Sequence, residues 1–77
     1  MSLTLILNGQ SRSFPTLSSS SNLDELVAEL GLQGDRVAVE HNGAIVPRTL
    51  WVQTVLGEGD RLEVVHFVGG GSGLADV

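Results

Sequence analysis

The sequence of 77 residues contains no cysteine, no lysine and no tyrosine, and its basic residues are four arginines. Without cysteine the chain forms no disulfide and offers no thiolate to a metal, so any sulfur chemistry must use sulfur brought by another molecule. Nine acidic residues leave a formal net charge of -5. This charge disfavours a nucleic-acid-binding surface, which is usually basic. It fits either docking on a complementary partner or simple solubility.

Long apolar runs are also missing. No run approaches the ~20 residues that span a bilayer, and the start of the chain lacks the basic region of a signal peptide. We therefore expect a cytoplasmic protein without a membrane partner. The length indicates a single domain, which buries about 60% of the surface that its unfolded chain exposes. Hydrophobic residues make up 42% and charged residues 17% of the sequence, a globular composition.

The start of the sequence predicts a β-hairpin. Leu3, Leu5 and Leu7 alternate with other residues, which is the period of a strand with one buried face. Asn8-Gly9 follows and suits the left-handed angles of a tight turn. Pro15 cannot donate to a ladder, so the returning strand ends or lies at a sheet edge there.

A short helix of about 9 residues is predicted after the serine-rich loop. Asn22 is a good N-cap, Glu25 stands three residues later in the first turn, and Gly31 is placed to end the helix. The apolar residues follow the spacing of one helical stripe: Leu23, Leu26, Val27 and Leu30.

The second half predicts another hairpin and a long last strand. Asn42-Gly43 separates a strand that contains Val37 and Val39 from a short strand at residues 44–46. Residues 61–68 are apolar on alternating faces, which predicts a central strand covered on both sides. The irregular segment between these strands contains four candidates for burial: Leu50, Trp51, Val55 and Leu56.

The predicted order is β-β-α-β-β-(short turn or helix)-β. One helix across a mixed sheet of four or five strands is the economical way to bury these stripes, so we expect an α+β fold. The closing strand would lie in the middle of the sheet. A mobile tail would project beyond it.

Several short motifs of the second half resemble the ThiS family, the small sulfur carriers of thiamine biosynthesis, which are relatives of ubiquitin. The residues that carry the resemblance are Val37-Ala38-Val39-Glu40-His41-Asn42-Gly43, Val46-Pro47-Arg48 with Trp51, Gly59-Asp60-Arg61-Leu62-Glu63-Val64-Val65 and Gly69-Gly70-Gly71. The resemblance covers the chain from Leu3 to Gly71. It implies a β-grasp (ubiquitin-like) fold, in agreement with the predicted order of elements.

The resemblance also implies a chemistry for the glycine run. An E1-like partner uses ATP to adenylate the terminal glycine carboxylate, and sulfur then replaces AMP to leave a thiocarboxylate. Thiazole synthase receives that sulfur, which comes from a donor such as a cysteine desulfurase. Carried over to this sequence, the reacting residue is Gly71 and the other member of the pair is Gly70. The chain itself would be a protein-bound sulfur donor, with no bound cofactor and no catalytic residue.

The sequence departs from the family where residues 72–77 follow the glycines. An internal glycine has an amide instead of a carboxylate and cannot be adenylated. We therefore divide the chain into a carrier domain at residues 1–71 and an extension at residues 72–77. We hypothesise that a tail-trimming protease removes this extension after Gly71.

Contacts with the partner are expected where the tail leaves the domain, at His66, Phe67, Val68 and Gly69. His41 is expected to be a polar group beside a turn. The two histidines, His41 and His66, lie far apart in sequence without a third ligand, so no metal site is predicted.

Three other functions stay open from the sequence. The chain could be the small subunit of molybdopterin synthase, or a sulfur carrier of another pathway. It could also be a ubiquitin-like interaction module that carries no sulfur.

Overall fold

The computed structural model describes residues 2–68 and 73–76. Its elements follow one another in this order: β1 (Leu3–Leu7), β2 (Gln10–Phe14), α1 (Leu23–Glu29), η1 (Gly34–Arg36), β3 (Val37–His41), β4 (Ala44–Ile45), η2 (Arg48–Gln53), β5 (Arg61–Val68) and β6 (Gly73–Asp76). The predicted order of strands and of the main helix is confirmed up to β5, and η1 and β6 are additions.

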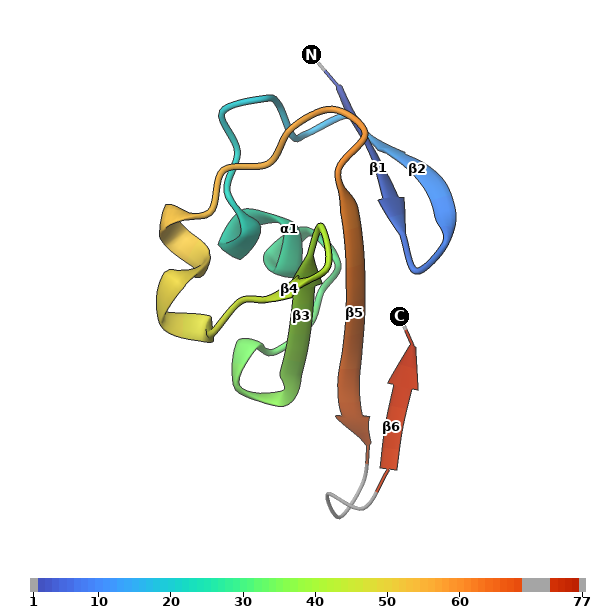
Figure 1. The fold of residues 1–77 in the computed structure, drawn as a ribbon, viewed down its shortest axis with the longest axis vertical. Coiled ribbons are helices and arrows are strands. Elements are labelled where there is room, and N and C mark those ends of the chain that lie inside the picture. The colour runs from blue at the N-terminus through green and yellow to red at the C-terminus, as the bar shows by residue number, and fades with distance from the viewer. Residues whose placement is uncertain (1, 69–72, 77) are drawn as a thin grey trace.

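The sheet has the strand order β2-β1-β5-β3-β4, and β6 also pairs with β5 (Figure 1). β1 and β5 run parallel, whereas the other neighbouring strands run antiparallel. The last long strand therefore lies in the middle of the mixed sheet, as the sequence predicts.

Both Asn-Gly turns are confirmed. Asn8 and Gly9 have φ angles of 50° and 82°, and Asn42 and Gly43 have 51° and 89°. Asparagine and glycine tolerate this left-handed region better than other residues, so these dipeptides connect β1 to β2 and β3 to β4. β2 ends at Phe14, directly before Pro15, because proline has no N–H for the ladder.

The helix has the predicted N-cap. The backbone N–H of Glu25 donates to Oδ1 of Asn22 at 2.9 Å, and Gly31 follows the helix with φ +74°. α1 is shorter than predicted, at 7 residues, because Leu30 is already its C-cap. Such a short helix depends on tertiary packing.

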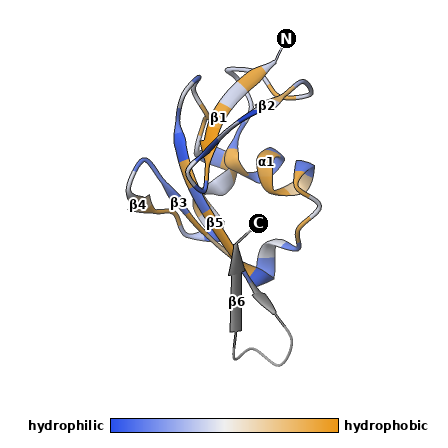
Figure 2. Ribbon diagram, turned by 90° about the vertical axis from the view of Figure 1, so that its right-hand side faces the viewer, coloured by the Kyte–Doolittle hydropathy of each residue, from blue (hydrophilic) through white to orange (hydrophobic). Residues whose placement is uncertain are grey.

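The core lies between one face of the sheet and α1, and Figure 2 shows the helix on that side alone. Its buried side chains are Leu3, Leu5, Leu7, Phe14, Leu17, Leu23, Leu26, Val27, Val39, Trp51, Leu56, Leu62 and Val64. The prediction that β5 is covered on both faces is wrong. Glu63 is exposed and Val65 is half-buried on the face away from the helix.

The segment between β4 and β5 forms the 3₁₀-helix η2. Trp51 is 1% exposed, and its Nε1–H donates to the carbonyl of Val46 at 2.9 Å. Its predicted burial is confirmed. Leu56 is buried as predicted, but Leu50 and Val55 are 45% and 58% exposed. Burial of these two residues is therefore a wrong prediction.

Candidate functional site

The central strand β5 leads directly to the predicted reaction site. β5 lies between β1 and β3 and ends at Val68. Gly69, Gly70 and Gly71 follow it and lie outside the described residues, so the prediction that they carry the chemistry is not tested by the structure. The backbone of Phe67 belongs to β5, as the sequence predicts.

The segment after the glycines returns to the sheet. Gly73–Asp76 forms β6, antiparallel to β5, and Val68 is the register partner of Gly73. Figure 1 shows β6 alongside the end of β5. The prediction of a tail that projects from the domain is therefore wrong for residues 73–76. The physical reason is that the edge of β5 offers main-chain groups that an extended segment can pair with.

His66 lies on β5 between two strands. Its register partners are Val37 on β3 and Ala75 on β6. Its Nδ1 is buried, and within residues 2–68 and 73–76 it finds no hydrogen-bond partner. A buried polar atom without a partner costs about 1–3 kcal/mol. The expected role of His66 in partner contact stays a prediction.

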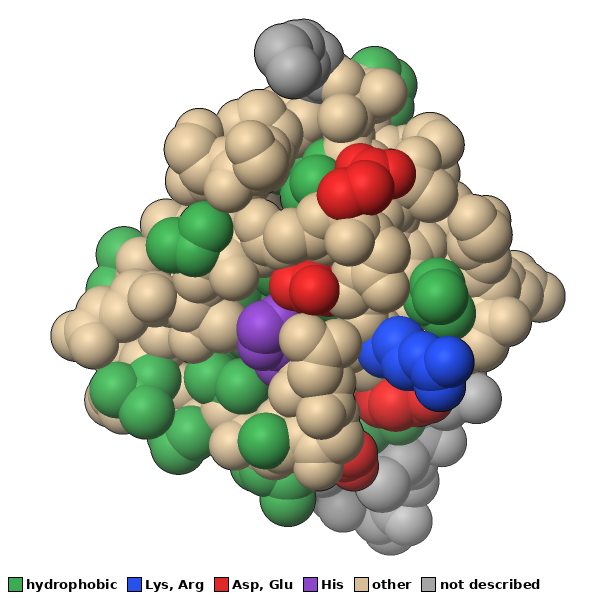
Figure 3. Space-filling view, turned by 45° about the horizontal axis from the view of Figure 1, so that its top comes forward, with side chains coloured by type: hydrophobic (Ala, Val, Ile, Leu, Met, Phe, Trp, Pro, Cys, Tyr) green, Lys and Arg blue, Asp and Glu red, His purple; other side chains and the backbone are tan. Residues whose placement is uncertain are grey.

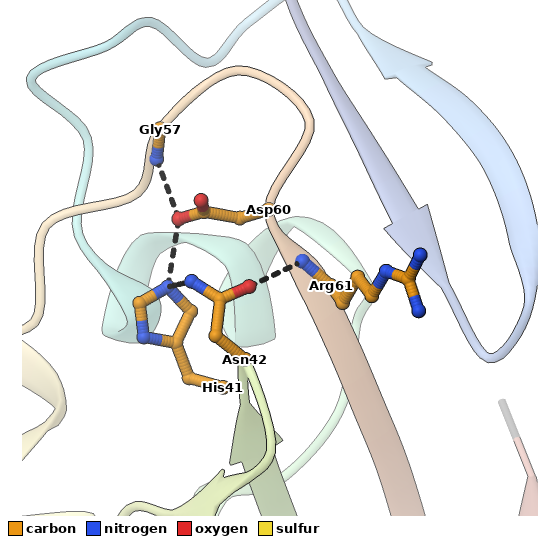
Figure 4. Close-up of polar contacts among 5 residues, drawn as sticks. All are labelled: His41, Asn42, Gly57, Asp60 and Arg61. Atoms are coloured by element: carbon orange, nitrogen blue, oxygen red, sulfur yellow. Dashed lines mark hydrogen bonds and ion pairs between the residues drawn. The ribbon is translucent and has the colours of Figure 1, made fainter.

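His41 and Asp60 fasten the turn that precedes β5. His41 Nε2 lies 2.7 Å from Oδ2 of Asp60, and the N–H of Gly57 donates to the same oxygen at 2.8 Å (Figure 4). The N–H of Arg61 donates to Oδ1 of Asn42 at 2.9 Å. These bonds join the β3–β4 turn to the start of β5. His41 is thus a polar group beside a turn, as predicted, and the cluster is structural.

The carboxyl group of Asp60 has a lowered pKa. Partial burial acts to raise the pKa, but hydrogen bonds from His41, Gly57 and Asn42, together with the attraction of His41, outweigh that effect. The ionised carboxylate is therefore the form that stabilises the fold.

Acid is expected to unfold the protein partly through Asp60. Because the pKa is lower in the folded state, its contribution is complete above about pH 4, the ordinary range of Asp. It is lost as the pH falls from there through the folded pKa. Urea unfolding at pH 2 to 7 should show that Asp60→Ala lowers stability by roughly 1–2 kcal/mol at neutral pH. Near pH 2 the difference in the free energy of unfolding between Asp60→Ala and the parent should be smaller. Asp35→Ala, at an exposed carboxylate of η1, is the control, and an equal acid loss in Asp60→Ala and the parent would contradict the assignment.

The face of the sheet away from α1 carries a hollow of about 140 Å³. Its lining residues are Ala38, Val39, Glu40, Ile45, Glu63 and Val65. Ile45 is 76% exposed. The sequence analysis did not predict this face, although the single carboxylate within each of the apolar strands 37–41 and 61–65 is a signal for it.

Two carboxylates oppose each other at this hollow. Glu40 on β3 is the register partner of Glu63 on β5, and both side chains are exposed. Like charges directly opposite on one face destabilise a sheet. An acidic pair beside an exposed apolar side chain is a candidate contact for a partner that carries a basic group.

Other chemistry is sparse in the described part of the chain. It holds no group of three or more side chains suited to a metal ion. None of its helices has the length and apolar character needed to cross a membrane. Figure 3 shows one face on which acidic side chains are spread out, with a histidine against one of them.

Comparison with known proteins identifies similar sequences and folds. Residues 5–71 match the model of the ThiS family. The crystal structure of the thiamine biosynthesis protein ThiS from Geobacter metallireducens is 33% identical and has a TM-score of 0.73. That match covers 90% of this chain and 100% of the other. The predicted β-grasp fold is thereby confirmed.

Two longer proteins named thiazole synthase are also similar. One from Paramagnetospirillum magneticum is 43% identical over 74 residues, which are 96% of this chain and 22% of that protein. One from Magnetococcus marinus is 42% identical over 65 residues, 84% of this chain and 19% of that protein. The chain spans about one fifth of the length of these relatives. Because 74 of 77 residues are matched, the similarity to the first continues past Gly71.

Proposed function

The chain belongs to the ThiS family of small sulfur carriers, and from this premise we propose that Gly71 carries sulfur as a thiocarboxylate for thiazole formation in thiamine biosynthesis. Carriers of this family are sulfur donors rather than catalysts. The observation that supports the proposal is the position of the glycines. They follow the central strand β5, and the family match ends at residue 71.

The proposed chemistry has two steps on the carboxylate of Gly71. A carboxylate oxygen attacks the α-phosphorus of ATP, and pyrophosphate leaves. Hydrosulfide then attacks the acyl carbon of the adenylate, and AMP leaves to give the thiocarboxylate. An E1-like enzyme binds the ATP. A desulfurase supplies the sulfur as a persulfide, and a second thiol releases it as hydrosulfide with formation of a disulfide. Glycine suits this end because it has no Cβ to obstruct a narrow channel, and residues 69–71 add roughly 10 Å of extended reach.

A free carboxylate at Gly71 requires cleavage of the bond to Ser72. Water hydrolyses that amide in the protease that we propose, and residues 72–77 leave as a peptide. The similarity to the longer relative extends past Gly71, which supports a chain that continues after this position in the group. Cleavage is in this proposal the step that makes the carrier competent.

The open face of β3, β4 and β5 is the docking surface in this proposal. It combines exposed Ile45 with the acidic pair Glu40 and Glu63. The partner that fits is the enzyme that receives the glycine end, through an apolar side chain in the hollow and a basic group over the carboxylates. The relatives named thiazole synthase support that enzyme as a second partner.

The function is tested with the chain that ends at Gly71. Incubated with an E1-like enzyme, ATP and sulfide, it should release AMP and change its intact mass by one oxygen-to-sulfur exchange. The 77-residue chain should do neither, because Gly71 then has no carboxylate. A chain 1–71 with a C-terminal amide is the matched control. Absence of AMP release from the free-acid chain with the ThiS-activating enzyme would refute the proposal and favour an interaction module.

A further inference from the structure

β5 has two edges, and one of them pairs with β3. Along the other edge, β1, the side chain of Asn8 and β6 follow one another. β1 comes first and pairs Ile6 and Leu7 with Arg61 and Leu62. The N–H of Asn8 then donates to the carbonyl of Leu62 at 2.8 Å. β1 turns away at this point, so its backbone leaves the rest of the β5 edge to other groups.

The side chain of Asn8 takes the next position. Its Nδ2 donates to the carbonyl of Val64 at 2.9 Å, and its Oδ1 accepts the N–H of Val64 at 2.7 Å. The amide thus makes both bonds that a paired strand would make with this residue. Its backbone φ of 50° belongs to the turn that directs the side chain there.

β6 takes the remaining edge. Residues 65–68 of β5 are in register with Gly73–Asp76. β6 adds main-chain pairing to a domain whose buried cluster already extends from Leu3 to Val64. A strand held mainly by pairing with one neighbour is marginally stable, so we expect it to be exchangeable.

We propose that the edge of β5 at residues 65–68 is a strand-acceptor site, occupied in the 77-residue chain by its own segment Gly73–Asp76. After cleavage at Gly71, an extended segment of the enzyme that receives the glycine end takes the same place. This inference rests on the proposed function for the identity of the partner. The occupation by β6 does not depend on it.

The position of the edge argues for this occupant. Residues 65–68 directly precede the glycines, so a protein that draws the glycine end into a channel passes along this strand. Pairing also places Gly73 beside Val68, whereas five extended residues would separate them by roughly 17 Å. The uncut chain therefore withholds both the carboxylate and the strand edge. An exposed edge favours unwanted pairing, and the chain's own segment covers it until cleavage.

Amide hydrogen exchange on the 1–77 and 1–71 chains tests the site. Alternate amides of residues 65–68 face β6, and these should exchange at least about tenfold faster in the 1–71 chain. Amides of β3 are the internal control and should not change. In the 77-residue chain, Leu74→Pro and Ala75→Pro address adjacent residues, of which one directs its N–H towards β5. The variant at that residue should reproduce the faster exchange, and its neighbour should have the smaller effect.

The partner is tested by the same measurement on the 1–71 chain bound to the adenylating enzyme. The same alternate amides should regain protection. A peptide of residues 72–77 should also restore it, at concentrations on the order of millimolar, the effective concentration of a short tether. Equal exchange in the 1–77 and 1–71 chains would overturn the acceptor site. If Gly71 is loaded with sulfur but the amides regain no protection, the partner contributes no strand at residues 65–68, and the proposed function is unaffected. If the amides regain protection but Gly71 is not loaded, the acceptor site stands and the proposed function is refuted.

Discussion

Replacing Trp51 with alanine is expected to lower the free energy of unfolding by about 3–5 kcal/mol. A domain of this size has roughly 4–12 kcal/mol in total. Trp51 is 1% exposed and is the largest of the fully buried side chains. Gly34 lies so close that a Cβ there would stand 3.2 Å from Cζ3 of the indole. Surrounding structure relaxes only partly around such a deletion, so we expect a cavity to remain.

Urea unfolding followed by circular dichroism measures this effect, because the variant lacks the only tryptophan of the chain. Val52→Ala is the matched control. Val52 is the next residue of η2, is 62% exposed, and should change stability by less than about 0.5 kcal/mol. If Trp51→Ala does not fold, Trp51→Phe keeps the measurement possible. It removes the donor to Val46 and should cost roughly 1–2 kcal/mol. A loss below about 1 kcal/mol in Trp51→Ala would contradict the assignment of Trp51 to the core.

Turns and caps were predictable because their causes are local. Asn8-Gly9 and Asn42-Gly43 adopt positive φ angles, and Asn22 caps the helix. Each outcome depends on the chemistry of two or three adjacent residues. The central place of β5 was also predicted, from apolar residues on both faces of the strand, and is confirmed, although only one of these faces is covered.

The exposed residues of η2 and β5 were not predictable in the same way. Leu50 and Val55 lie near Trp51 and Leu56, and all four are apolar. Which of these side chains faces the core depends on the 3₁₀ geometry of η2 and on the extended backbone that follows it. Val65 is only half-buried because α1, the one α-helix among residues 2–68 and 73–76, covers the other face of the sheet.

β6 was missed because its strand is determined by a distant edge. Gly73–Asp76 contains no β-branched or aromatic residue, so its own sequence has little strand propensity. Its pairing depends on β1 ending early and on Asn8 filling one position of the β5 edge. The candidate site was therefore predicted as a chemical group, Gly71, but without the docking face and the acceptor edge beside it.

Reversing one charge of the open face is expected to strengthen the fold and weaken docking. Glu63→Lys places a cation opposite Glu40, which replaces repulsion with attraction and should raise stability by roughly 0.2–1 kcal/mol. In the chain that ends at Gly71, the same change should raise the KM for adenylation by about tenfold at low salt, with kcat unchanged. Added salt should narrow that difference, because exposed charges are screened.

Asp35→Lys separates the acidic pair from net charge. It changes the charge of the chain by the same amount at an exposed residue of η1, away from the hollow. Its KM should change much less than that of Glu63→Lys. If both variants raise the KM equally, docking depends on the overall charge of the chain and not on the acidic pair. If Glu63→Lys lowers the free energy of unfolding, Glu40 and Glu63 do not repel each other. A Glu63→Lys variant that is more stable but docks more weakly would identify Glu40 and Glu63 as a pair that is retained for the partner at a cost to the stability of the fold.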